Sequence, residues 1–417
     1  MLRGGNPLED LRYLDSGDAP FWPLFKPIRL MGLLLGLWPS GLGQRRSSLL
    51  SSLWAACLLL FHSYLAVKAI LWFDRDIDHH LNHSTVFKVN LAVAVVGSWF
   101  VRLFLLLAHV RLIKMFAYMH REFKAELPNL KQFKGLAILM PLFSLLLTLL
   151  AAVLCTLIVL DYEQTGDYGI LRVPFEQSFF GRRHRHAFLE FISFLLVVGS
   201  WEFATLLLLF FCQLIIALLR GMVRGMRVTI GGSMEAERKS VNHSAMLAFH
   251  SVFHHISMLT HIANRVFALL ILLFCLAACG LLAFDLFFWT RKEKKEGDKA
   301  VNLAILFTML FVLLKFAAVV VHGILIDDKE SVMYALIRQL YQQKLSQRKM
   351  GEEEEEDVKA MKNPLLKFSM EVNLFIQEII GSDIKLTVAD LFPIRRSLLP
   401  KMLLTLLAYW LLLYLTK

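Results

Sequence analysis

The sequence has few cysteines and few charged residues. Charged side chains make up 19% of its 417 residues, against roughly 25% in ordinary soluble domains. The five cysteines all lie within long apolar stretches: Cys57, Cys155, Cys212, Cys275 and Cys279. This placement argues against extracellular disulfides and against a zinc site in a loop. The loops also lack a Ser-His-Asp order, a glycine-rich phosphate loop and paired carboxylates, so we expect no enzymatic activity and no cofactor.

Apolar residues are abundant instead, at 57% of the chain, against roughly 45–50% in soluble domains. Several apolar runs reach the roughly 20 residues of helix that cross a bilayer. We therefore predict an all-α membrane protein with seven transmembrane helices. The predicted spans are 47–73, 86–110, 135–160, 187–219, 266–290, 300–326 and 398–416.

The basic residues predict the orientation of these spans. If the N-terminus is cytoplasmic, most of the 45 lysines and arginines fall on the inner side, as membrane proteins prefer. The same preference explains the net charge of +11 without nucleic acid as a partner. Seven spans then place the C-terminus outside the cell. We expect a multi-pass protein of the plasma membrane, with lipid as its main surroundings.

The predicted organisation alternates membrane and cytoplasmic regions. The long inside loops carry helical patterns, which predict cytoplasmic extensions that form an anchor domain; a six-residue acidic run, 352–357, is a solvated linker. The regions are 1–46 (cytoplasmic, with a re-entrant or interfacial segment), 47–219 (spans one to four), 220–265 (cytoplasmic loop and helical extension), 266–326 (spans five and six), 327–397 (cytoplasmic loop) and 398–417 (last span).

The last span has one polar face. Lys401, Thr405, Tyr409, Leu412 and Thr416 are spaced by three or four residues, so they share one side of a helix, while the other side is almost entirely leucine. A polar stripe turns away from lipid. The stripe is either a packing seam or the lining of a pore.

Charged residues also occur deep inside three other spans. Arg102, Glu202 and Lys315 lie at similar depth in the second, fourth and sixth spans. Because an isolated charge in lipid costs several kcal/mol, we expect Glu202 to pair with Lys315 or Arg102. The pair is either purely structural or the wall of a ligand pocket. Aromatic residues suited to such a pocket lie beside the charges: Trp99, Trp201 and Phe203.

Histidines cluster in the loop before the fifth span. His250, His254 and His255 have the spacing found in membrane di-iron enzymes, but such enzymes need several of these motifs and the chain has one, so we expect no metal. A different set shares one helical stripe: His243, His250, His254 and His261. This stripe is either a polar packing seam or a subunit contact in a symmetric oligomer.

Two segments resemble insect odorant and gustatory receptors and their gustatory receptor-like relatives. The segment from Phe25 to Pro39 is similar to the short re-entrant element of that superfamily, with its Gly-Leu-Trp-Pro ending. The end of the chain, Ala408-Tyr409-Trp410-Leu411-Leu412-Leu413-Tyr414-Leu415-Thr416-Lys417, resembles the signature of the superfamily's last helix. Ala408 stands where the signature has Thr, and Leu415-Thr416 stands where it has Gln-Phe.

The resemblance implies a homotetrameric, ligand-gated, non-selective cation channel. The last helices would line a central pore, with Leu412 at the hydrophobic gate position, Leu415 at the glutamine position and Thr416 after it. A small-molecule ligand would enter an outward-facing pocket among the second, third, fourth and sixth spans. The alternatives are a non-conducting relative with the same fold and, less favoured, a membrane di-iron lipid enzyme.

The predicted orientation can be tested with two glycosylation sequons. Asn82-His83-Ser84 falls in the first predicted outside loop, and Asn242-His243-Ser244 falls in a predicted inside loop. Any N-linked glycan on the expressed protein should therefore be on Asn82. We expect Asn82→Gln to abolish the gel shift caused by endoglycosidase and Asn242→Gln to leave it unchanged. A shift abolished only by Asn242→Gln would reverse the orientation.

Overall fold

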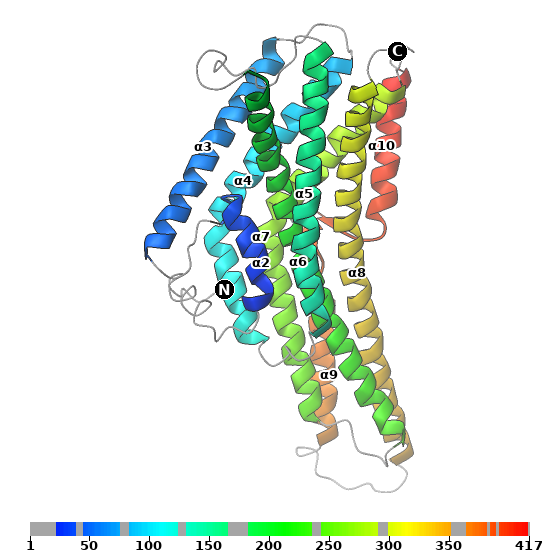
Figure 1. Cartoon of the computed structure of the whole chain (residues 1–417). Helices are drawn as coiled ribbons and strands as arrows, with labels where there is room; N and C mark the ends of the chain where they lie inside the picture. The colour runs from blue at the N-terminus through cyan, green and yellow to red at the C-terminus, as the bar shows by residue number, and fades with distance from the viewer. Residues whose placement is uncertain are drawn as a thin grey trace.

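The apolar runs of the sequence form long helices that pack side by side (Figure 1). The computed structural model describes residues 22–38, 45–75, 83–123, 131–165, 182–235, 243–290, 299–351, 364–381, 384–388 and 392–415. The acidic run 352–357 and Thr416 lie outside these residues. The helices are α2 (Trp22–Leu34), α3 (Arg45–Arg75), α4 (His83–Glu122), α5 (Lys131–Thr165), α6 (Arg182–Glu235), α7 (His243–Thr290), α8 (Lys299–Gly351), α9 (Pro364–Gly381) and α10 (Leu398–Leu415). The strands β1 (Thr387–Val388) and β2 (Phe392–Pro393) form an antiparallel pair.

Helices α3 to α8 each contain a segment long and apolar enough to cross a membrane. Within the described residues these segments are Leu49–Leu71, Ala92–Glu122, Ile138–Leu157, Phe188–Val228, Met246–Leu282 and Met309–Gln339. The predicted seventh span corresponds to α10, an 18-residue helix made mostly of leucine. The all-helical membrane fold predicted from the sequence is thus confirmed.

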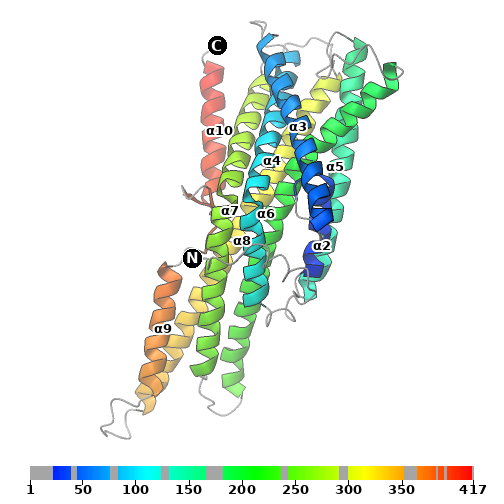
Figure 2. The same ribbon diagram turned by 90° about the vertical axis from the view of Figure 1, so that its left-hand side faces the viewer.

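Three helices are much longer than a membrane is thick. α6, α7 and α8 contain 54, 48 and 53 residues, which at 1.5 Å per residue is about 72–81 Å. The hydrocarbon core measures about 30 Å, so these helices continue beyond it. Figures 1 and 2 show the lower parts of these helices in a second bundle below the bundle of membrane-spanning segments (the upper bundle), with α9 packed along α7 and α8. The described parts of the region 220–265 are helical, because α6 continues to Glu235 and α7 begins at His243.

Helix α5 shows what surrounds the upper bundle. Its buried side includes Pro141, Ser144, Thr148, Ala151 and Ala152. Its other sides carry a nearly continuous set of exposed apolar residues: Ile138, Leu139, Leu142, Phe143, Leu145, Leu146, Leu149, Leu150, Val153 and Leu157. Soluble proteins rarely expose apolar patches of this extent. This surface of α5 is therefore suited to contact with lipid or with another subunit.

The short helix α2 is buried against the large ones. The Phe25 ring lies 3.8 Å from that of Phe116 on α4, centre to centre, and Trp38 meets His109 edge-on. Gly36 ends the helix with a φ of 64°, a conformation that favours glycine. The amides of Leu37 and Trp38 both donate to the Gly32 carbonyl. The predicted re-entrant segment is thus a docked helix with an ordered end.

Arg102 on α4 holds that end of α2 in place. Its guanidinium is fully buried and donates to the Leu35 carbonyl at 2.7 Å and to the Ser200 hydroxyl of α6 at 3.2 Å. A helix C-terminus carries partial negative charge, which partly compensates a buried cation. Glu202 is paired elsewhere. Arg102 is therefore bound to the end of α2. It does not form the ion pair with Glu202 that was one of the two alternatives.

Removing the Arg102 guanidinium should loosen α2. We expect Arg102→Met to lower the free energy of unfolding by about 1–3 kcal/mol, because the buried Leu35 carbonyl loses its donor. Arg102→Lys should fall between Met and wild type, since one ammonium reaches fewer acceptors than the guanidinium fork. The measurement is thermal unfolding in detergent. The control is Arg111→Met, an exposed arginine of the same helix; an equal loss in both variants would contradict this role.

Candidate functional site

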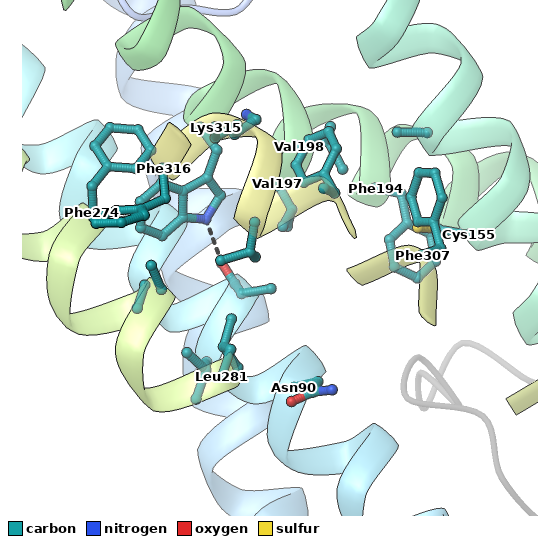
Figure 3. Close-up of a pocket in the computed structure, with 18 residues that line it drawn as sticks. Asn90, Cys155, Phe194, Val197, Val198, Phe274, Leu281, Phe307, Lys315 and Phe316 are labelled. Carbon is teal, nitrogen blue, oxygen red and sulfur yellow. Dashed lines mark hydrogen bonds between the residues drawn. The ribbon is translucent and has the colours of Figure 1, made fainter. Parts of the chain in front are cut away.

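An apolar cavity lies in the upper bundle between α4, α5, α6, α7 and α8 (Figure 3). Its volume is ≈ 140 Å³. Cavities of about 150 Å³ with apolar walls accept a benzene-sized molecule. Six aromatic side chains contribute to its wall: Phe194, Trp201, Phe274, Phe307, Phe311 and Phe316. The polar groups among the lining residues are the Asn90 amide, the Cys155 thiol and the Lys315 side chain.

Trp201 of α6 is the most firmly held part of the wall. Its indole N–H donates to the Ala94 carbonyl of α4 at 3.1 Å, the dashed bond in Figure 3. Its ring meets Phe274 of α7 edge-on, with 5.2 Å between centres. The indole also lies close to Gly97, where an added Cβ would come within 2.6 Å of the ring. Three helices thus fix one aromatic surface of the cavity.

A buried ion pair lies at the edge of the cavity. The Lys315 ammonium of α8 is 2.7 Å from a Glu202 carboxylate oxygen of α6, and both side chains are less than a tenth exposed. The Ser144 hydroxyl of α5 lies 3.5 Å from the other carboxylate oxygen. The Lys315 Nζ also lies over the Phe311 ring, 4.2 Å from its centre. Mutual neutralisation allows both charges to stay in the apolar bundle.

The six predicted pocket residues divide into two groups. Trp201 and Lys315 line the cavity, and Glu202 pairs with Lys315. Trp99 instead donates from its indole to Ser63 of α3, at 2.8 Å. Phe203 packs under Gly32 of α2, and Arg102 binds the end of that helix. Successive helical residues point about 100° apart, so neighbours in sequence face different partners.

The aromatic residues of α7 and α8 were missing from the predicted site. Phe307, Phe311 and Lys315 recur every fourth residue and form one stripe on α8. The Phe307 and Phe311 rings stack at 5.9 Å, and Phe311 carries the Lys315 ammonium. This spacing around a buried charge could have identified them. Phe274 has no comparable signal, because it lies in a uniformly apolar run.

Helix α10 carries the predicted pore residues and lies at the edge of the bundle, beside α7 (Figure 2). Lys401, Thr405 and Leu415 are exposed in the single chain, as are Leu404, Leu407 and Leu411. The Thr405 hydroxyl donates to the Lys401 carbonyl of its own helix at 2.9 Å. The side chains of Tyr409 and Leu412 lie outside the described part. Much of this helix is therefore left for lipid or another copy to cover.

Two members of the predicted histidine stripe make contacts within the chain. His250 and His254 of α7 both hydrogen-bond to the Glu378 carboxylate of α9. His261 is exposed, and the side chain of His243 is outside the described part. The neighbouring His255 contacts Tyr118 and Glu122 of α4. Among the described residues no group of three or more His, Cys, Asp or Glu could hold a metal ion.

Solved structures of similar fold exist, although comparison with known protein families and with curated proteins gives no match to the sequence. The chain is similar to the insect olfactory receptor OR5 from Machilis hrabei, with a TM-score of 0.72 and 10% identity. It is also similar to the same receptor in complex with eugenol, with a TM-score of 0.65 and 13% identity. Both alignments cover 94% of this chain and 98% of the receptor. The fold is therefore that of an insect olfactory receptor.

Lys315 and Glu202 should contribute to the stability of the protein jointly, so that their effects in single and double variants are not additive. Removing one charge leaves the other buried without a partner, so we expect Lys315→Met or Glu202→Leu to destabilise the protein by about 3–5 kcal/mol. The double variant should recover most of this loss, since no charge then stays in the apolar bundle. Thermal unfolding in detergent measures the cycle, with the exposed Arg224→Met of α6 as control. Additive losses in the double variant would contradict the pairing.

Proposed function

We propose that the chain is a chemoreceptor of the gustatory receptor-like type that works as a homotetrameric, ligand-gated, non-selective cation channel in the plasma membrane. The observation that carries the proposal is the aromatic cavity in the upper bundle, because it gives a receptor fold a place for a small ligand. The similarity of fold to an olfactory receptor, over nearly the whole chain, supports it. That receptor has also been solved in complex with eugenol.

The cavity's size and lining indicate the class of ligand. A volume of ≈ 140 Å³ has room for about one ring or a short aliphatic chain. Aromatic walls favour a flat apolar molecule, and the few polar side chains, Asn90 and Lys315 at opposite ends of the cavity, favour an oxygen near one end of it. Eugenol is a single-ring phenol that also carries a methoxy group and an allyl chain. We therefore expect small, largely apolar single-ring compounds with one or two oxygen functions.

The conducting path in this proposal is lined by four copies of α10. Thr405 and Tyr409 would face the axis, and Leu412 would close the path by dewetting; Leu415 and Thr416 would lie at its outer end. Because α10 leaves much of its described surface exposed in one chain, neighbouring copies have room to pack against it. The competing proposal is a binding protein with the same fold and no conduction. Leu415 favours this alternative, because the superfamily's signature has glutamine at this position.

Whole-cell recording on surface-expressed protein separates conduction from binding alone. We expect a panel of single-ring oxygenated volatiles, eugenol included, to evoke inward current. Leu412→Ala should produce current without ligand, because a smaller side chain lets water enter the constriction. Trp201→Ala should shift the ligand dose–response by about tenfold or more, since a buried aromatic contact is lost.

The matched control for the gate is Leu407→Ala, an exposed leucine on the other side of α10. It should leave the current unchanged. If neither the ligand panel nor Leu412→Ala produced current in protein proven to reach the surface, the channel proposal would be wrong and the binding protein would be favoured.

A further inference from the structure

The described residues of the connection between α9 and α10, 384–388 and 392–397, include a packed hairpin. Thr387 pairs with Pro393 and Val388 with Phe392, and the Ile394 amide donates to the Leu386 carbonyl at 2.8 Å. Four of its apolar side chains are fully buried: Ile384, Leu386, Val388 and Ile394. Figure 2 shows this segment between the upper end of α9 and the lower end of α10. The position of α10 therefore depends on what holds the hairpin.

Helix α7 contacts the hairpin through the amide side chain of Asn264. Asn264 is buried, and its Nδ2 donates to the Lys385 carbonyl at 2.6 Å. Its Oδ1 accepts from the Thr387 amide at 3.2 Å. The Asn264 side chain thus forms the two hydrogen bonds that a neighbouring strand would otherwise form with the backbone of Lys385 and Thr387. Any movement of α7 near Asn264 acts directly on β1.

Helix α8 holds the hairpin through a close contact at Gly323. A Cβ added there would lie 2.6 Å from Cγ2 and 2.8 Å from Cβ of Ile394. Real Cβ atoms do not come this close to a neighbour, so any other residue at 323 displaces the hairpin. Alanine normally improves a helix relative to glycine. Here the contact with Ile394 reverses that preference.

Two ion pairs extend the contact with α8 toward α10. Arg396 donates to Asp328 at 2.7 Å, and Arg395 Nε lies 3.8 Å from Asp327. Both arginines precede the first residue of α10 by no more than three positions. Because these side chains are partly exposed, the ion pairs contribute little to the stability of the fold. Their main effect is to fix the direction in which the chain enters α10.

The same two helices bound the cavity. α7 contributes Phe274 and Ala277 to its wall, and α8 contributes Phe311 and Lys315. Lys315 precedes Gly323 by eight residues of one unbroken helix, a distance of about 12 Å. A helix transmits a shift along its axis over such a distance with little loss.

We propose that Asn264 and Gly323 are positioning residues that couple the cavity to α10 through the hairpin strands, residues 384–388 and 392–394. Filling the cavity displaces α7 and α8, and the hairpin carries this displacement into the first turn of α10. The Asp328–Arg396 pair keeps the hairpin and α10 moving as one unit. This inference rests on the proposed channel function for its purpose and adds the route by which a bound ligand would open the gate.

Hydrogen exchange on the full chain in lipid nanodiscs tests the coupling without a ligand. Ala277→Phe adds a ring to the cavity wall and serves as a fixed occupant. We expect it to change exchange in the hairpin and in the start of α10 by about threefold or more. Adding Gly323→Ala or Asn264→Ala should abolish the change in α10. The control is Leu314→Phe, which adds a ring on the exposed side of α8 and should change nothing there.

A charge-reversal cycle gives a second test if the Gly323 variant does not fold. In the Ala277→Phe background, Asp328→Arg and Arg396→Asp should each reduce the response of α10, and the double reversal should restore it. The exposed Arg338→Asp of α8 should have no effect. Unchanged α10 exchange in Ala277→Phe, or a full response that persists in the Asn264, Gly323 and single-reversal variants, would overturn the proposal.

The two proposals fail in different ways. Exchange measures movement and needs no conduction. A protein that shows the coupled exchange and carries no current would keep the coupling and lose the channel. A protein that conducts on ligand addition with no coupled exchange would keep the channel and lose this route.

Discussion

The structure depends on one constraint: in lipid, each charge must find its partner inside the protein. Arg102 meets the constraint at the C-terminal end of α2, where backbone carbonyls concentrate negative potential. Lys315 meets it with Glu202. These two interactions stabilise different parts of the upper bundle. The Arg102 contact fixes the short helix α2 among its larger neighbours, and the Lys315–Glu202 pair joins α6 to α8 at the edge of the cavity.

The cavity is a consequence of the same arrangement. The Lys315–Glu202 contact brings α6 and α8 together at one point, and Trp201 locks α6 to α4 and α7 at another. Between these points the facing side chains are rings and small residues such as Ala94, Ala151 and Ala278. Large rigid rings and small residues do not fill space evenly, so a void of ≈ 140 Å³ is left where the helices cannot approach further.

The sequence predicts the helices far better than the directions in which side chains point. Apolar length locates the spans, and the cost of isolated charges predicts that Glu202 is paired. Which partner it takes depends on the rotation of each helix, which the sequence leaves open between Arg102 and Lys315. Their closeness in sequence to a charge predicts Trp99 and Phe203 in the pocket, but they turn toward α3 and α2. The hairpin had no signal, because its two-residue strands are too short for an alternating pattern.

In helix α10, the polar stripe in the sequence suggests a higher free-energy cost of contact with lipid than the structure supports. The stripe from Lys401 to Thr416 is polar by residue type, yet the Thr405 hydroxyl is satisfied by the Lys401 carbonyl within its own helix. A threonine bonded in this way can face either lipid or water at little cost. Lys401 lies one turn into the helix, close to the hairpin and to the predicted inner boundary, where a lysine can extend its amine to water. The polarity of the stripe therefore constrains the surroundings of α10 less than its residue types suggest, and the case for a pore depends on the leucine that closes it.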